Sequence, residues 1–243
     1  MQAILEQEAK ERIASVIARY FDRKAQNGRL FINLGVGIPT MVANYVTSQN
    51  IYVQAENGML GVGCAAPEGQ MDHDLINAGR TCVMETPGCS YLDSAASFGM
   101  IRGGHIDATV IGAFEVDQQA NIANWIIPNG KQLGVGGAMD LVTGAREVVI
   151  AMQHTSKNGK PKLVRQCTLP ITGIGEADMV VSEYAVFVFE GGRLVLKEIA
   201  PEITVDELRG ITDAEFEVSA DLPVMCNTGQ SSFLCNRGQS SFL

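Results

Sequence analysis

Apolar positions near the start of the chain repeat with the period of an α-helix. They follow the spacing i, i+3, i+4 and i+7 at Ile13, Val16, Ile17 and Tyr20. This spacing places the apolar side chains on one face of a helix. The Asn27-Gly28 pair that follows is a typical helix stop signal. We therefore predict an amphipathic helix that ends near residue 27.

Short apolar runs then alternate with glycine turns and further helical patterns. The run LFINL leads into the turn GVGIP, and a helix is expected from about Thr40. The next strand is expected in IYVQAE, before a glycine-rich loop. Later runs of the same character are TCVMET (81–86), IDATVIGAF (106–114), REVVIAMQ (146–153) and KLVRQCTL (162–169). This alternation predicts an α/β fold, with an open, mainly parallel sheet and helices on both faces.

Three local motifs add detail to this pattern. DSAASFGMIRGG predicts a helix with an N-cap at Asp93 or Ser94 and a stop at Gly103-Gly104. VFVFEGGRLVLKEI predicts a β-hairpin that turns at Gly191-Gly192. TVDEL contains a capping box from Thr204 to Glu207, which opens a short last helix.

The length of 243 residues suits one large domain or two small ones, and no Pro- or Ser-rich linker divides the chain. We therefore expect a single domain over residues 1–220. The last residues contain CNTGQSSFL followed at once by CNRGQSSFL, two copies that differ at one position. Two such short copies cannot build a repeat architecture. We interpret residues 221–243 as a tail outside the fold.

Composition and charge exclude several classes of protein. A net charge of −9 argues against a nucleic-acid groove, which needs a surplus of Lys and Arg. The six cysteines form no C-x-x-C pair and lack zinc-site spacing, so we expect reduced thiols and no metal. No signal-peptide pattern and no apolar run of 18 residues is present. We expect a cytoplasmic protein without membrane contact.

The familiar catalytic motifs are missing. The glycine clusters match neither G-x-G-x-x-G nor the phosphate-binding P-loop, so nicotinamide and ATP lack support. There is no G-x-S-x-G elbow and no H-E-x-x-H. The three histidines His73, His105 and His154 are widely separated, and a structural or surface role is the simpler interpretation of each.

One acidic residue among glycines remains. Glu56 follows IYVQA, so it is expected at the carboxyl end of a strand, where open α/β sheets place their sites. A carboxylate there can act as a nucleophile toward an acyl group if donors stabilise the oxyanion, for which the amides of GVGG (134–137) are candidates. The alternative is that Glu56 accepts hydrogen bonds from loop amides and so shapes the turn. The residues alone leave both open.

A set of longer motifs, taken together, resembles a known family. They occur in the order ENG (56–58), DLINAG (74–79), SFGMIRGGHID (97–107), ANWIIP (123–128), GGAMDLVTGA (136–145) and CTLPITG (167–173). This set is similar to the B (beta) subunit of the class I, 3-oxoacid type, CoA-transferases. The likeness covers roughly residues 8 to 218. It implies the open α/β architecture of that family, which is also similar to glucosamine-phosphate isomerases.

The resemblance implies a ping-pong reaction through the glutamate of ENG, here Glu56. That glutamate attacks an acyl-CoA and passes through an anhydride to a glutamyl-CoA thioester. The family's oxyanion donor corresponds to Gly136-Gly137, with the Gly137 amide favoured. Asn33, Gly35 and Asn57 match segments that shape the pocket. No permanently bound cofactor is implied, because coenzyme A is both substrate and covalent intermediate.

The resemblance also implies a partner, because this chain contains only the B half. A separate A (alpha) subunit is expected, in an αβ or α2β2 assembly. The expected substrates are an acyl-CoA and a short-chain acid of the acetoacetate, acetate or butyrate type. The alternative within the family is a succinyl-CoA:3-oxoacid enzyme. More remote alternatives are a sugar-phosphate isomerase-like protein with Glu56 as general base, and a structural partner in which Glu56 never reacts.

Overall fold

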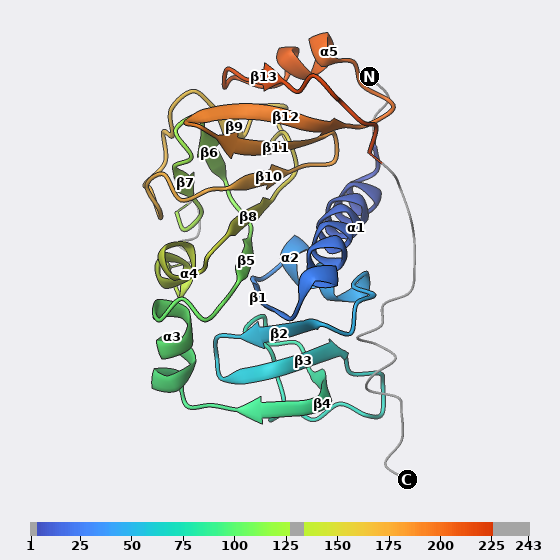
Figure 1. Ribbon diagram of the computed structural model, residues 1–243, viewed down its shortest axis with the longest axis vertical. Helices are drawn as coiled ribbons and strands as arrows, with labels where there is room; N and C mark the ends of the chain where they lie inside the picture. The colour runs from blue at the N-terminus through green and yellow to red at the C-terminus, as the bar shows by residue number, and fades with distance from the viewer. Residues whose placement is uncertain (1–3, 127–133, 226–243) are drawn as a thin grey trace.

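The computed structural model describes residues 4–126 and 134–225. Helices and runs of consecutive strands follow one another through this part of the chain (Figure 1). The helices are α1 (Glu6–Lys24), α2 (Ile38–Met41), α3 (Ser94–Arg102), α4 (Ala138–Gly144) and α5 (Val205–Gly210), with 3-10 turns at Ala25–Asn27 and Val42–Asn44. The strands are β1 (Leu30–Leu34), β2 (Ile51–Ala55), β3 (Met59–Ala65), β4 (Val83–Tyr91), β5 (Ala108–Ile111), β6 (Glu115–Asp117), β7 (Ile122–Ala123), β8 (Val148–Ala151), β9 (Leu163–Val164), β10 (Met179–Val181), β11 (Ala185–Glu190), β12 (Arg193–Ile199) and β13 (Glu217–Val218).

The main sheet of the described chain has ten strands in the order β13-β12-β11-β10-β8-β5-β1-β2-β3-β4. Its middle strands, β10, β8, β5, β1 and β2, all run parallel. Antiparallel pairs extend it through β3 and β4 on one side and through β11 and β12 on the other. The residues of β5, β8 and β10 are buried throughout, as expected of strands covered on both faces.

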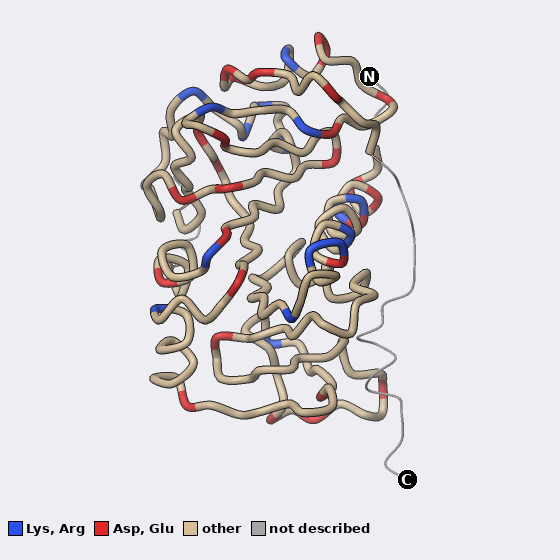
Figure 2. Tube along the Cα trace, viewed as in Figure 1, with Lys and Arg blue, Asp and Glu red and all other residues tan. Residues whose placement is uncertain are grey.

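Helices cover both faces of this sheet. α1 lies along one face and packs Ile13, Ile17 and Phe21 into the larger core, while acidic residues at its start and basic residues at its end suit the helix dipole. Figure 2 shows Lys and Arg positions recurring along α1. α3 and α4 lie on the other face, where Ile101 and Leu141 form a second apolar cluster (Figure 1). The predicted fold class is confirmed.

Local predictions also hold. α1 and its 3-10 extension end at Asn27, and Asp93 caps α3 by accepting a hydrogen bond from the Ala96 amide. The Thr204–Glu207 capping box is present at α5. The predicted hairpin is β11–β12, with Gly191 and Gly192 at φ 58° and 75° in its turn.

Three expectations need correction. The glycine-rich segment after Glu56 is not a loop but strand β3, which pairs antiparallel with β2. The run 162–169 forms only the two-residue β9, which joins β6 and β7 in a separate three-stranded sheet. The run 81–86 begins a longer strand, β4, which passes through Pro87; this is tolerated because β4 is the edge of the sheet.

Packing continues slightly past the expected domain boundary at residue 220. Val224 bridges to Ile199 at the end of β12, and Met225 is buried in the core. The repeated nine-residue segments, 226–234 and 235–243, lie outside the described residues. Within the described chain, none of the helices combines the length and the apolar composition needed to cross a bilayer.

Candidate active site

Glu56 lies at the tip of the β2–β3 hairpin, directly after the carboxyl end of a parallel strand. The Gly58 amide closes the turn by donating to the Ala55 carbonyl at 3.0 Å. Gly58 has φ 127°, and a Cβ there would lie 2.2 Å from the Leu92 carbonyl oxygen. The turn is thus held by its backbone and by glycine, so Glu56 is not needed to shape it.

A series of buried, hydrogen-bonded polar side chains leads from α3 to the Glu56 carboxylate. Asn33 Nδ2 donates to Glu56 Oε2 at 3.2 Å and to Gln54 Oε1 at 2.8 Å. Gln54 Nε2 donates in turn to Ser97 Oγ on α3 at 2.8 Å. Asn33, Gln54 and Ser97 are all fully buried. Their hydrogen bonds orient the carboxylate from β1, β2 and α3 together.

The second polar atom of the Asn33 side chain is also buried. Its Oδ1 is buried without a hydrogen bond from any described residue. An orphaned buried acceptor costs about 1–3 kcal/mol, and such groups gather at functional sites.

Gly137 brings backbone against the same carboxylate. A Cβ at Gly137 would lie 3.0 Å from the Phe98 ring and 3.6 Å from Glu56 Cγ. A side chain would thus meet Phe98 on one side and Glu56 on the other. Gly137 is the N-cap of α4, and Gly136 before it has φ 54°. The glycines allow the start of α4 to approach Glu56 closely.

The site opens into a cleft of about 760 Å³ across the carboxyl ends of the parallel strands. Residues that follow β1, β2, β5 and β8 all line it, together with the start of α4. Its walls are glycine-rich and apolar between a few polar groups. This is the edge at which open parallel sheets bind ligands.

The structure brings most of the predicted site residues together. Glu56, Gly35, Gly136 and Gly137 line the cleft, and Asn33 joins them through its hydrogen bond. Asn57 differs, because its side-chain Nδ2 donates to the Ile76 carbonyl at 2.8 Å, in the loop before β4.

Two basic residues of the cleft were missed by sequence analysis. Arg80, with φ 63°, is exposed, and Lys162 is half-buried next to β9. Lys162 lies in an apolar run that predicted a strand, so no motif marked it. Burial lowers the pKa of Lys162 to about 8, against the opposing effect of the Glu183 carboxylate. By contrast Arg102, which belongs to a recognised motif, pairs with Asp140 at 2.7 Å and ties α3 to α4.

His154 lies just past the end of β8 and is structural. Its Nε2 is 2.8 Å from Thr212 Oγ1, which itself donates to the Leu208 carbonyl, so Nε2 must carry the proton. Nδ1 is then free to accept from Ser182 Oγ at 3.0 Å. Burial lowers the pKa of His154 to about 4, with the Lys162 charge adding to the effect. Among the described residues, no three His, Cys, Asp or Glu side chains form a possible metal site.

The chain is similar to known proteins along most of its length. The Coenzyme A transferase family model matches residues 13–210. The chain is 46% identical over 189 residues to the B-type chain of a succinyl-CoA:3-ketoacid coenzyme A transferase from Helicobacter pylori, covering 78% of this chain and 91% of that one. It is 47% identical over 216 residues to the beta subunit of an acetate CoA-transferase from Escherichia coli, covering 88% and 96%.

The fold has solved counterparts. An acyl-CoA transferase from Escherichia coli O157:H7, solved as a thioester complex with CoA, superposes with a TM-score of 0.69 at 22% identity. The match covers 93% of this chain but only 44% of that longer one. At this identity the likeness speaks for the fold. Taken with the sequence matches, it shows that the chain belongs to the Coenzyme A transferase family, as a transferase subunit of the beta kind.

Proposed function

We propose that this chain supplies the nucleophile, Glu56, of a CoA-transferase that works by a ping-pong mechanism. One observation carries the proposal: the Glu56 carboxylate is oriented by buried Asn33 while it opens into a ligand-sized cleft. A carboxylate that shapes a turn would accept hydrogen bonds from the backbone amides of that turn. Here the turn is closed without it.

In the first step a carboxylate oxygen of Glu56 attacks the thioester carbonyl of the donor acyl-CoA. The C–S bond breaks, CoA leaves as the thiolate, and an acyl-glutamyl anhydride remains. The thiolate then attacks the glutamyl carbonyl of that anhydride. This step frees the donor acid as its carboxylate and leaves CoA in a thioester with Glu56. The acceptor carboxylate runs the same two steps in reverse, so no net proton or water is used.

Gly137 supports these steps as an oxyanion donor. The Gly137 backbone comes close to the Glu56 side chain, and its amide is the candidate for stabilising the tetrahedral intermediates. In this scheme Asn33 is a positioning residue, because its Nδ2 donates to Glu56 Oε2 and keeps the carboxylate in one orientation. Gly35 and Gly136 leave backbone space along the cleft, whereas Asn57 fixes the loop beside it.

The substrates are an acyl-CoA and a short-chain acid of the acetoacetate, acetate or butyrate type, and coenzyme A is the covalently carried group. A separate A (alpha) subunit, in an αβ or α2β2 complex, completes the enzyme. The need for a partner subunit is supported by the relatives, whose names describe them as subunits. One of these names also supports the second candidate, a succinyl-CoA:3-oxoacid enzyme. We place this enzyme in ketone-body and short-chain fatty acid metabolism in the cytoplasm.

The test uses this chain co-purified with its alpha subunit. The complex is incubated with acetoacetyl-CoA, quenched, digested and mapped by peptide mass spectrometry. We expect a CoA thioester on the peptide that contains Glu56. A complex that exchanges CoA between acids while Glu56 stays unmodified would contradict the mechanism. Exposed Glu68 on the loop before β4 offers a matched control, since E68Q should keep the adduct and E56Q should lose it.

Acceptor preference separates the two candidate substrate groups. With acetoacetyl-CoA as donor, faster exchange into acetate or butyrate supports the first candidate. Faster exchange into succinate supports the second.

A further inference from the structure

The charged residues that line the cleft have a positive balance, although the protein as a whole is acidic. The protein has a net charge of −9. Yet the charged residues described in the cleft lining are one carboxylate, Glu56, and two cations, Arg80 and Lys162. A local surplus of positive charge in an acidic protein indicates a site for an anion. The two cations differ, because Arg80 is exposed and Lys162 is half-buried.

Lys162 is held firmly from its backbone. Its amide donates to the His154 carbonyl at 3.1 Å, and its carbonyl accepts from the Val116 amide at 2.9 Å. These bonds join the segment after β8 to strand β6. The side chain therefore starts from a fixed position at the β8 end of the cleft, which is the requirement for a residue that selects ligands.

The Lys162 side chain is half-buried, and its ammonium group has no close partner among the described residues. No hydrogen bond or ion pair joins it to another residue in the described part of the chain, and Glu183 acts on it only as a more distant charge. Burial is the cause of its lowered pKa. A carboxylate arriving from the cleft would supply such a partner, because a charged hydrogen bond in a partly dry site is strong.

The apolar part of the cleft lining suits a short aliphatic chain. It includes Val36, Ile111, Ala113 and Met152, with glycine between them. A cleft of about 760 Å³ has room for a short acyl chain.

Resting on the proposed function, we propose that Lys162 is a specificity-determining residue which binds a carboxylate at the far end of the acyl group. Of the two candidate substrate groups, this inference favours the second, because succinate is a dicarboxylic acid. Glu56 reacts at one end of the cleft while Lys162 holds the other end. A single ammonium charge matches one carboxylate, whereas a phosphate of CoA carries more charge and suits an exposed arginine better.

The test compares acids of equal length with and without the second charge. Binding of succinate and glutarate is measured by calorimetry beside butyrate and pentanoate, on the assembled complex. CoA exchange into the same four acids is then measured. We expect the dicarboxylates to be preferred, and K162M to reduce kcat/KM for them on the order of 10- to 100-fold. The monocarboxylates should change less than about 3-fold, so the selectivity ratio collapses.

Two variants separate charge from structure. K162R keeps the positive charge and should retain part of the preference. K160M is the matched control, because Lys160 is exposed, lies two residues away and does not line the cleft. It should leave both series unchanged.

The results that overturn the inference are distinct from failure of the proposed function. An equal loss for both series of acids in K162M would mean that Lys162 holds CoA or supports the fold. An unchanged preference in K162M, or a wild-type complex that binds both series alike, would also overturn it. If no acid exchanges CoA, the proposed function fails, and selective dicarboxylate binding that K162M removes would still uphold the role of Lys162.

Discussion

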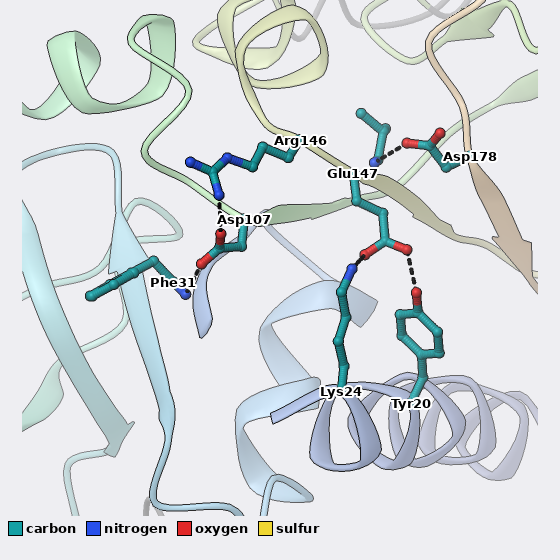
Figure 3. A network of polar contacts seen from close by, with 8 residues as sticks. Tyr20, Lys24, Phe31, Asp107, Arg146, Glu147 and Asp178 are labelled. Atoms are coloured by element: carbon teal, nitrogen blue, oxygen red, sulfur yellow. Dashed lines mark hydrogen bonds and ion pairs between the residues drawn. The ribbon is translucent and has the colours of Figure 1, made fainter. Parts of the chain in front are cut away.

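The two edges of the same parallel sheet use carboxylates in opposite ways. At the amino edge, Asp107 accepts from the Phe31 amide at 2.8 Å and from Arg146 at 3.1 Å, and Asp178 accepts from the Val148 amide at 2.7 Å (Figure 3). At the carboxyl edge, Glu56 meets one buried side-chain amide and an open cleft. A carboxylate engaged by strand amides is structural, whereas one held from one side keeps its other face for chemistry.

Glu147 extends this contrast at the amino edge. It accepts from Lys24 Nζ at 2.6 Å and from the Tyr20 hydroxyl, both on α1 (Figure 3). Burial, followed by the hydrogen bond to Glu147, raises the pKa of Tyr20, so the hydroxyl stays a donor. This carboxylate ties a helix to the sheet. The comparison thus predicts separable effects: activity at one edge and stability at the other.

The largest effect is expected from removing the nucleophilic oxygen. Glu56→Gln keeps the size of the side chain, yet it should lower CoA transfer by at least about 10⁴-fold, because no anhydride can form. Glu147→Gln at the amino edge is the matched substitution. It should leave kcat per folded molecule unchanged. Steady-state rates on both complexes check this, and comparable losses in the two variants would remove the distinction between the edges.

The next effect concerns the backbone beside the nucleophile. Gly137→Ala places a Cβ 3.0 Å from the Phe98 ring and 3.6 Å from Glu56 Cγ, so the start of α4 or Phe98 must shift. We expect transfer to fall roughly 10- to 100-fold through misplacement of the amide. Gly99→Ala on α3 is the control, since nothing lies within 4 Å of its Cβ. It should be active and about 0.5–1 kcal/mol more stable. Full activity in Gly137→Ala would exclude the Gly137 amide as oxyanion donor.

His154 refines the comparison, because it shows that the carboxyl edge also contains a structural side chain whose polar atoms are hydrogen-bonded within the protein. Its pKa falls from 6.5 to about 4 in the folded protein. The unfolded chain therefore binds an extra proton between these values, and the stability contribution is lost as pH falls below about 6.5. From pH 7 to pH 5 the loss is about 2 kcal/mol. Urea unfolding at both pH values measures it. In His154→Gln the loss of stability between pH 7 and pH 5 should shrink by that amount. An unchanged loss would mean that other titratable groups cause it.

The smallest effect is expected at the amino edge itself. Asp107→Asn weakens the acceptor for the Phe31 amide and removes an ion pair with the exposed Arg146. We expect a loss of about 1 kcal/mol in the free energy of unfolding. CoA transfer at a temperature where the variant is folded should be unchanged. A selective loss of transfer without a loss of stability would show that the two edges are coupled.

Sequence analysis reached the fold through periodicity and end signals, and it failed where tertiary pairing overrides local preference. The apolar stripe of α1, the Asp93 cap and the Gly191-Gly192 turn are all local, so their elements could be predicted. The segment after Glu56 could not, because glycine disfavours strands and only pairing with β2 and β4 makes it β3. Likewise, only Leu163 and Val164 of the apolar run 162–169 find strand partners.

The candidate site divides in the same manner. The chain itself determined the carboxylate at a strand end, the glycines around it and the family to which the motifs point. Only the tertiary structure decided that Asn33 reaches Glu56, that Asn57 bonds the Ile76 carbonyl, and that Lys162 shares the cleft. The physical reason is distance along the chain. Periodicity and caps act within a few residues, whereas Glu56 and Lys162 are brought to one cleft only by strand order in the sheet.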